Sequence, residues 1–173
     1  MTQELIDLRN SIVAGRYEEA LAIVDELEGM SKQAILRNIQ AFVKILLIHL
    51  IKNQIEQRLT NSWSSSIRNS IMEIKRLNLK DNKKSYYVNL EEWENLILEE
   101  VMEDAIASAS EEVLNGAYNQ FQLGEIVDKI SLLQTALRFL NLTYEHSSKT
   151  LPNAIAEALI QLPGGENWIN RKG

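Results

Sequence analysis

The chain has 173 residues, no cysteine, only seven glycines and two prolines, and a formal net charge of -6 at pH 7. Without cysteine it can form no disulfide, thiolate metal site or cysteine nucleophile. The acidic balance is atypical of a general nucleic-acid-binding protein and lowers the expectation of a nucleic-acid partner without excluding one. The scarcity of glycine and proline favours long helices over a many-stranded sheet, so we predict an all-α fold.

We expect one helical domain over residues 1–173, because a chain of this length fits a single domain. Its predicted parts are an N-terminal helical hairpin (1–30), three long helices (31–115), and C-terminal helices with a tail (116–173). The N-terminal segment lacks the basic start and the apolar run of a signal peptide, which indicates a cytoplasmic protein.

The first two predicted helices form the hairpin. Apolar residues recur at helical spacing over residues 3–14 and again over residues 17–28. Gly15 and Gly29 follow these two runs, and glycine commonly lies just past the end of a helix. We therefore expect two short antiparallel helices joined by a tight turn.

The next predicted helix is the centre of a helical bundle. Ser31 is a suitable N-cap, and the helix is expected to run to about residue 57. Its segment 41–51 is apolar nearly all round, which places it inside the protein. This segment is shorter than the roughly 20 apolar residues that span a bilayer, so we expect no membrane partner.

The rest of the chain is predicted to alternate helices with loops. Apolar residues at helical spacing, with capping residues before them and glycine or proline after them, mark the helices. The first of these elements are a helix over 62–77 capped by Asn61 or Ser62 and a loop over 78–88. A helix over 90–114 follows, with Asn89 and Glu92 as a capping box and Gly116 as its end. The remaining elements are a helix over 123–140 with a break near Ser131, a loop over 141–150, a helix over 152–162, and a tail to Gly173 that is mobile at its end.

His49 lies within the apolar segment and is the first residue to consider for catalysis or metal binding. No carboxylate stands three or four residues before it, so the pattern favours a core histidine whose ring nitrogen is hydrogen-bonded, with Trp63 and a polar group of the next helix as candidate partners. The alternative is an enzyme or metal-binding bundle that joins His49 to Glu99, Glu100 or Glu103. We predict no catalytic, cofactor-binding or metal-binding residue and lean away from an enzyme, because the acidic cluster has the pattern of a solvated helix face.

A basic stretch between residues 58 and 84 is the best candidate for a binding patch. Such a surface could contact phosphates or an acidic protein, although its side chains could equally pair with acidic helices of the same domain. The patch comprises Arg58, Arg68, Lys75, Arg76, Lys80, Lys83 and Lys84.

Part of the sequence resembles a known family. The matching blocks are Leu46-Leu47-Ile48-His49-Leu50-Ile51-Lys52, Asn61-Ser62-Trp63-Ser64-Ser65-Ser66-Ile67-Arg68, and Ile71 with Glu73 and Ile74. They are similar to the pattern of the domain-of-unknown-function-29 family, all-helical bacterial proteins abundant in cyanobacteria. The resemblance implies that His49, Lys52, Trp63, Ile67 and Arg68 are signature positions of a structural kind. It is strongest over residues 31–77 and implies a fold, not an activity.

These observations favour a non-enzymatic protein-interaction or adaptor module without a cofactor. The expected partner is a protein, which includes a second copy of this chain, because apolar helix faces left exposed promote self-association. Two alternatives remain open at this stage. One is a nucleic-acid-binding or regulatory protein that uses the basic stretch 58–84, and the other is the His49 enzyme or metal site.

Overall fold

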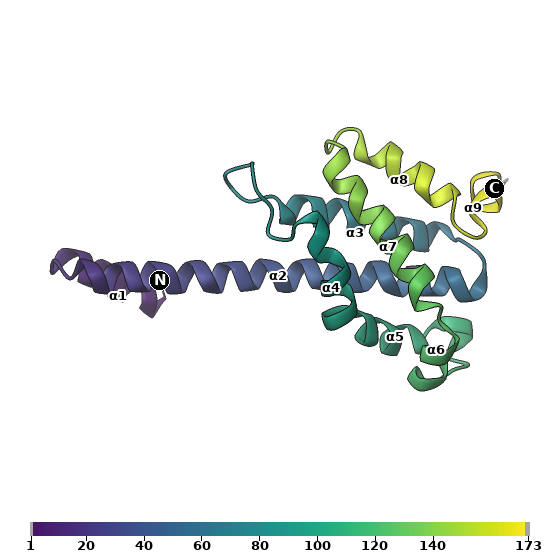
Figure 1. Cartoon of the computed structure of the whole chain (residues 1–173), viewed down its shortest axis with the longest axis horizontal. Coiled ribbons are helices and arrows are strands. Elements are labelled where there is room, and N and C mark those ends of the chain that lie inside the picture. Colours follow the sequence, from purple (N-terminus) through teal and green to yellow (C-terminus); the bar gives the residue numbers. More distant parts are fainter. Residues whose placement is uncertain (1, 172–173) are drawn as a thin grey trace. The chain divides into compact units, whose positions relative to one another are not determined.

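Helices make up nearly all of the regular structure in the computed structural model, which describes residues 2–171 (Figure 1). The one extended pairing recorded within that range is an isolated antiparallel bridge between Leu79 and Tyr86. The predicted all-α class is therefore confirmed. The chain divides into two compact units, Met1–Asn38 and Ile39–Gly173.

The first unit is a helical hairpin. Helix α1 (Gln3–Val13) is followed by a short turn and by the first part of helix α2 (Tyr17–Glu56). In the turn, Gly15 has a φ of 75°, a left-handed conformation that glycine adopts without steric cost. The Arg16 amide donates to the Ser11 carbonyl at 2.8 Å and closes the turn. The predicted hairpin turn is confirmed.

Helix α2 does not end where the sequence predicted. It passes through Gly29 and Ser31 without interruption, so the predicted end at Gly29 and the predicted N-cap at Ser31 are wrong. A glycine inside a helix costs about 1 kcal/mol relative to alanine. The strong helix formers on both sides, such as Leu27, Glu28 and Met30, outweigh that cost.

The second half of α2 supplies the core of the second unit. Six of its apolar side chains are 2 % exposed or less: Ile39, Val43, Leu46, Leu47, Leu50 and Ile51. The predicted central helix is thus buried along one face of this part. Ala41 and Ile45 are exposed, and so are most of residues 31–38, so the prediction of a helix buried over 31–57 is wrong for its first part. Among the described residues, α2 is also a helix long and apolar enough to cross a membrane by composition, with a mean hydropathy of 1.6, although core helices show the same property.

Three helices of the second unit pack on one another, namely α3 (Asn61–Asn78), α7 (Lys129–Glu145) and α8 (Leu151–Ile160). The short helix α9 (Gly165–Ile169) packs on α8. Thr60, and not Asn61 or Ser62, caps α3, because its hydroxyl accepts from the Trp63 amide at 3.1 Å.

The predicted helix over 90–114 is broken into several pieces. The predicted capping box of Asn89 and Glu92 is present, and Gly116 ends the segment in the left-handed conformation. Between them lie a 3-10 turn (Leu90–Glu92), α4 (Trp93–Leu96), a π-helical turn (Ile97–Val101), α5 (Met102–Ser110) and a second 3-10 turn (Val113–Asn115). Helix α6 (Gln120–Ile126) then packs on α5.

The C-terminal predictions need three corrections. The break near Ser131 lies earlier, at the start of α7, where the Asp128 carboxylate accepts from the Ser131 amide. Helix α7 runs on to Glu145, so half of the predicted loop 141–150 is helical. The predicted tail contains α9, whereas residues 172–173 lie outside the described range.

Gly164 lies where the C-terminal segment packs closely on the turn between α2 and α3. Its φ is 74°, and a Cβ atom there would lie 2.7 Å from Cα of Arg58. Gly116, in the same unit, has a φ of 77°, but its closest neighbour would lie 3.3 Å away. Gly116→Ala should pay about 1–2 kcal/mol for the left-handed conformation. Gly164→Ala should lose at least about 1 kcal/mol more, because backbone must also move.

Urea unfolding followed by circular dichroism measures both variants. An equal loss of stability in the two variants would contradict the close approach at Gly164.

Candidate functional site

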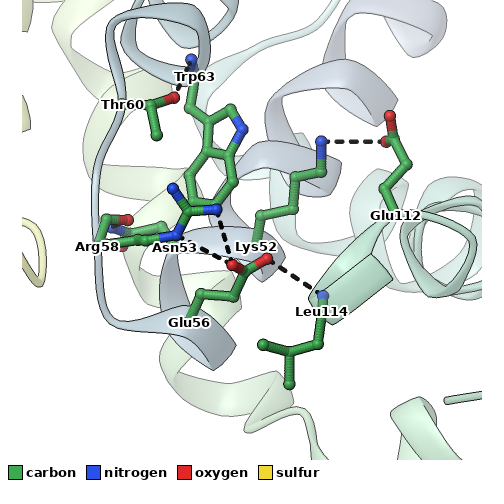
Figure 2. Close-up of polar contacts among 8 residues, drawn as sticks. All are labelled: Lys52, Asn53, Glu56, Arg58, Thr60, Trp63, Glu112 and Leu114. Carbon is green, nitrogen blue, oxygen red and sulfur yellow. Dashed lines mark hydrogen bonds and ion pairs between the residues drawn. The ribbon is translucent and has the colours of Figure 1, made fainter. Parts of the chain in front are cut away.

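Three residues singled out from the sequence meet at the C-terminal end of α2, around the indole ring of Trp63 (Figure 2). Trp63 is 8 % exposed. The guanidinium carbon of Arg58 lies 4.6 Å from the ring centroid, and Nζ of Lys52 lies 5.4 Å from it. Both cations are within the range of cation–π attraction. We call this group the Trp63 cluster.

Two carboxylates complete the Trp63 cluster and tie it to the 3-10 turn at Val113–Asn115. Glu56 Oε1 accepts from Nε and Nη2 of Arg58 at 3.0 and 2.9 Å, and its Oε2 accepts from the Leu114 amide at 3.3 Å. Nζ of Lys52 lies 3.2 Å from Oε2 of Glu112. Because Lys52 is buried, its ion pair with Glu112 offsets the cost of desolvating the ammonium group.

The turn after α2 places the Arg58 side chain over the Trp63 ring. Gln57 has a φ of 54°, and its amide donates to the Asn53 carbonyl at 2.9 Å. The buried Asn53 side-chain amide donates to the carbonyls of Arg58 and Pro163 at 3.1 and 2.8 Å. This side chain therefore fixes both the turn and the C-terminal segment.

The chain also adopts an uncommon conformation where Glu56 meets the turn. Leu114, Asn115 and Gly116 have consecutive positive φ angles of 47°, 59° and 77°. Left-handed conformations cost free energy at non-glycine residues. The hydrogen bond from the Leu114 amide to Glu56 helps to hold this turn in place.

His49 lies about one turn before Lys52, and its ring is already hydrogen-bonded. Nδ1 lies 2.8 Å from the Ile45 carbonyl, which can only accept, so Nδ1 carries the hydrogen. Burial lowers the pKa of His49 below its ordinary 6.5. The positive charge of Lys52 also lowers this pKa, whereas the hydrogen bond to the Ile45 carbonyl and the negative charge of Glu112 raise it. The hydrogen-bond partner found for the His49 ring is thus a carbonyl of its own helix, whereas Trp63 lies against Lys52 and Arg58.

The three carboxylates proposed to work with His49 are not among the groups that shift its pKa. Glu103 forms an ion pair with Nζ of Lys129 at 2.9 Å, and Glu99 and Glu100 are exposed. Within residues 2–171 there is no group of three or more histidine, aspartate or glutamate side chains that could hold a metal ion.

The remaining signature positions lie on α3. Ile67 is fully buried in the core. Arg68 is exposed and lines a pocket of about 240 Å³, which Trp168 and Leu159 also line.

The predicted basic patch does not behave as one group. Lys75 donates to the Thr143 carbonyl at 2.7 Å, and Arg76 forms an ion pair with Glu73 at 2.6 Å. Arg58 is paired with Glu56, as described above. Nζ of Lys80 lies 5.5 Å from the Tyr87 ring centroid, whereas Lys83 and Lys84 are exposed in the loop after α3.

A buried polar network that the sequence did not reveal holds this loop. The Asn78 side chain donates to the Val88 carbonyl at 2.9 Å and accepts from the Val88 amide at 2.7 Å. The Tyr144 hydroxyl donates to the Val88 carbonyl at 2.6 Å and accepts from Trp93 Nε1 at 2.6 Å and from Asn78 at 3.1 Å. Burial raises the pKa of Tyr144 to about 12. The hydroxyl therefore stays protonated and can keep donating.

Comparison with known proteins adds no relative to these observations. No family model, curated protein or solved structure matches the chain. The resemblance to the domain-of-unknown-function-29 family thus stays a prediction that rests on residues 46–74. The geometry of the Trp63 cluster is that of a structural clamp, since both cations are paired with carboxylates of the same fold.

The lowered pKa of His49 makes stability depend on pH. The unfolded chain binds the proton on His49 more tightly than the folded chain does. The free energy of unfolding therefore falls as pH drops from 6.5 towards the lower pKa of the folded state, and it is unaffected by His49 above 6.5. A proton NMR titration of the His49 ring should give a midpoint below 6.5. His146→Gln removes the only other histidine and assigns the signal. A midpoint at or above 6.5 would contradict the burial argument.

Removing the Tyr144 hydroxyl should destabilise the second unit. Tyr144→Phe leaves the Trp93 indole N–H and part of the Val88 carbonyl without their partner, which should cost about 1–3 kcal/mol. Tyr86→Phe is the matched control, because the Tyr86 ring packs edge-on against Tyr144 with centroids 4.7 Å apart while its hydroxyl is outside the network. Chemical denaturation of both variants measures the difference, and equal losses would argue against the network.

Proposed function

We propose that the protein is a non-enzymatic interaction module whose N-terminal hairpin binds an apolar helical surface of a protein partner. One observation carries the proposal: among residues 2–38, the only buried side chains are Ser11 and Ala20. Seven large apolar side chains in the same range are exposed, namely Leu5, Ile6, Ile12, Val13, Tyr17, Leu21 and Met30.

Such a hairpin has apolar stripes but no core of its own. Isolated helices shorter than about 12–15 residues are marginal in water, and helical stability in proteins comes mostly from burying an apolar face. Helix α1 has 11 residues, so propensity alone does not explain it. Contiguous exposed apolar surface marks a protein-interaction site. The hairpin therefore needs a partner that also presents an apolar helical surface.

The alternatives identified from the sequence have weaker support. A phosphate-binding role needs a cluster of free cations. Arg58, Lys75 and Arg76 are engaged within the fold, and the other four residues of the patch are spread over α3 and the loop after it. An enzyme built on His49 needs a nearby base or ligand set, and the His49 ring is hydrogen-bonded to the Ile45 carbonyl. Neither alternative has an observation comparable to the uncovered hairpin.

Affinity capture with a matched pair of variants tests the proposal. Ile12→Glu/Leu21→Glu changes two exposed apolar residues of the hairpin, and Phe121→Glu/Ile130→Glu changes two in the second unit that are 74 % and 73 % exposed. Tagged proteins are incubated with cytosol, with and without nuclease treatment, that also contains a differently tagged copy of the chain, and bound proteins are quantified by mass spectrometry.

The hairpin variant should lose at least about tenfold of a protein that the wild type and the control variant both retain, which corresponds to about 1.4 kcal/mol of binding free energy. Circular dichroism checks that both variants stay helical. Identical sets of bound proteins, or binding that nuclease abolishes, would overturn the proposal.

A further inference from the structure

We infer that the partner of the hairpin is a second copy of this chain, with the two N-terminal segments of α2 antiparallel. The inference rests on the proposed function, because it names the occupant of the same apolar surface. Three observations support it: the charge pattern along α2, the absence of partners for those charges, and the size of the uncovered surface.

The charges of α2 are separated into two blocks. Residues 17–28 contain five acidic side chains and no basic one, whereas residues 29–38 contain two basic side chains and no acidic one. The acidic block comprises Glu18, Glu19, Asp25, Glu26 and Glu28, and the basic block comprises Lys32 and Arg37.

Most of these charges have no partner within the described part of the chain. Glu19 pairs with Arg16 at 2.8 Å, but no ion pair or side-chain hydrogen bond involves Asp25, Glu26, Lys32 or Arg37. All four are exposed. They are therefore available to a molecule that covers the apolar stripe beside them.

A second copy satisfies this pattern only in one direction. In a symmetric dimer each copy uses the same surface. An antiparallel pair with its two-fold axis near residues 28–31 places each acidic block beside the basic block of the other copy. A parallel pair would place acidic block beside acidic block, and such like-charge contacts disfavour pairing.

The uncovered surface is large enough for such a dimer. Standard interfaces involve roughly 20–30 residues and about 800 Å² on each side. The hairpin spans residues 2–38 and exposes seven large apolar side chains. Two hairpins bring together four helices, the number that encloses a shared core in the common helical bundles.

Oligomeric state is the first measurement. The full chain should have a mass in solution of twice 19.8 kDa by light scattering or sedimentation. Ile12→Glu/Leu21→Glu should give a monomer, and Phe121→Glu/Ile130→Glu should remain a dimer. A monomeric wild type at about 100 μM, or loss of the dimer only in the second variant, would overturn the inference.

Spin labels then test the direction of pairing, and the chain has no cysteine to interfere. In an antiparallel pair, nitroxides at Ser31→Cys should lie close enough for strong dipolar broadening, whereas nitroxides at Glu18→Cys should lie about 30 Å or more apart at 1.5 Å per residue. Short distances at both positions would show a parallel pair and overturn the stated arrangement. No dipolar signal at either would show that α2 does not pair.

The charge argument has its own test. Arg37→Glu should raise the dissociation constant severalfold, because each dimer contains two such contacts. Lys83→Glu, a reversal in the exposed loop of the second unit, should leave it unchanged. Equal effects of the two substitutions would contradict the role of the basic block.

The interaction module and the dimer can be contradicted independently of each other. A monomeric chain that still captures another protein through the hairpin would overturn the dimer and leave the interaction module. A dimer that persists in Ile12→Glu/Leu21→Glu would contradict both assignments to the hairpin.

Discussion

The fold of the second unit depends on how α2 ends inside it. One apolar face of α2 lies in the core, and the polar end of the helix must then satisfy buried polar groups, because an unpaired one costs free energy. Lys52, Asn53, Gln54 and Glu56 do this, and they reach four separate segments. Lys52 and Glu56 bind Glu112 and the Leu114 amide of one turn, and Gln54 binds the backbone of Asp128. Asn53 donates to the carbonyls of Arg58, in the α2–α3 turn, and Pro163. These few residues thus fix the α2–α3 turn, the Val113–Asn115 turn, the start of α7 and the C-terminal segment relative to one another.

The Trp63 cluster belongs to the same arrangement. Arg58 is placed over Trp63 because Gln57 adopts a left-handed conformation and Asn53 holds the Arg58 carbonyl. Its carboxylate partner, Glu56, also holds the Leu114 amide. An aromatic ring with two nearby cations can suggest a ligand site, yet each cation here already has its counter-charge within the fold. Lys52 and Trp63, two of the positions in the resemblance pattern, thus both make contacts within the fold.

The sequence predicted local features well and distant contacts poorly. The apolar segment 41–51, the Asn89–Glu92 capping box and the turn at Gly15 depend on neighbouring residues, and all three are present. The polar block after the apolar segment was visible in the sequence, but its partners lie up to 110 residues away, at Pro163. Asn78 and Tyr144 were missed for the same reason. Neither has a local signal, since the network forms only when the loop folds back on α7.

The break in the predicted helix 90–114 also has a physical reason. Trp93, Ile97 and Val101 are buried at intervals of four residues. On a regular α-helix, with 3.6 residues per turn, such a series rotates away from a fixed face. The wider π turn at Ile97–Val101 keeps these side chains directed to the same side. Sequence periodicity alone does not distinguish a drifting stripe on a regular helix from a fixed stripe on a widened turn.

The two units contrast in how their polar and apolar groups are satisfied. Every buried side-chain nitrogen and oxygen in the described residues has a hydrogen-bond partner, and the second unit has a large apolar core. The hairpin has the opposite balance, because seven of its large apolar side chains are exposed and only Ser11 and Ala20 are buried. A sequence selected only for solubility would not keep seven large apolar side chains exposed on two helices while separating the charges beside them by sign. Both features have one explanation if the hairpin is half of a core that a second molecule completes, because burial then supplies the affinity and the charge blocks set the direction.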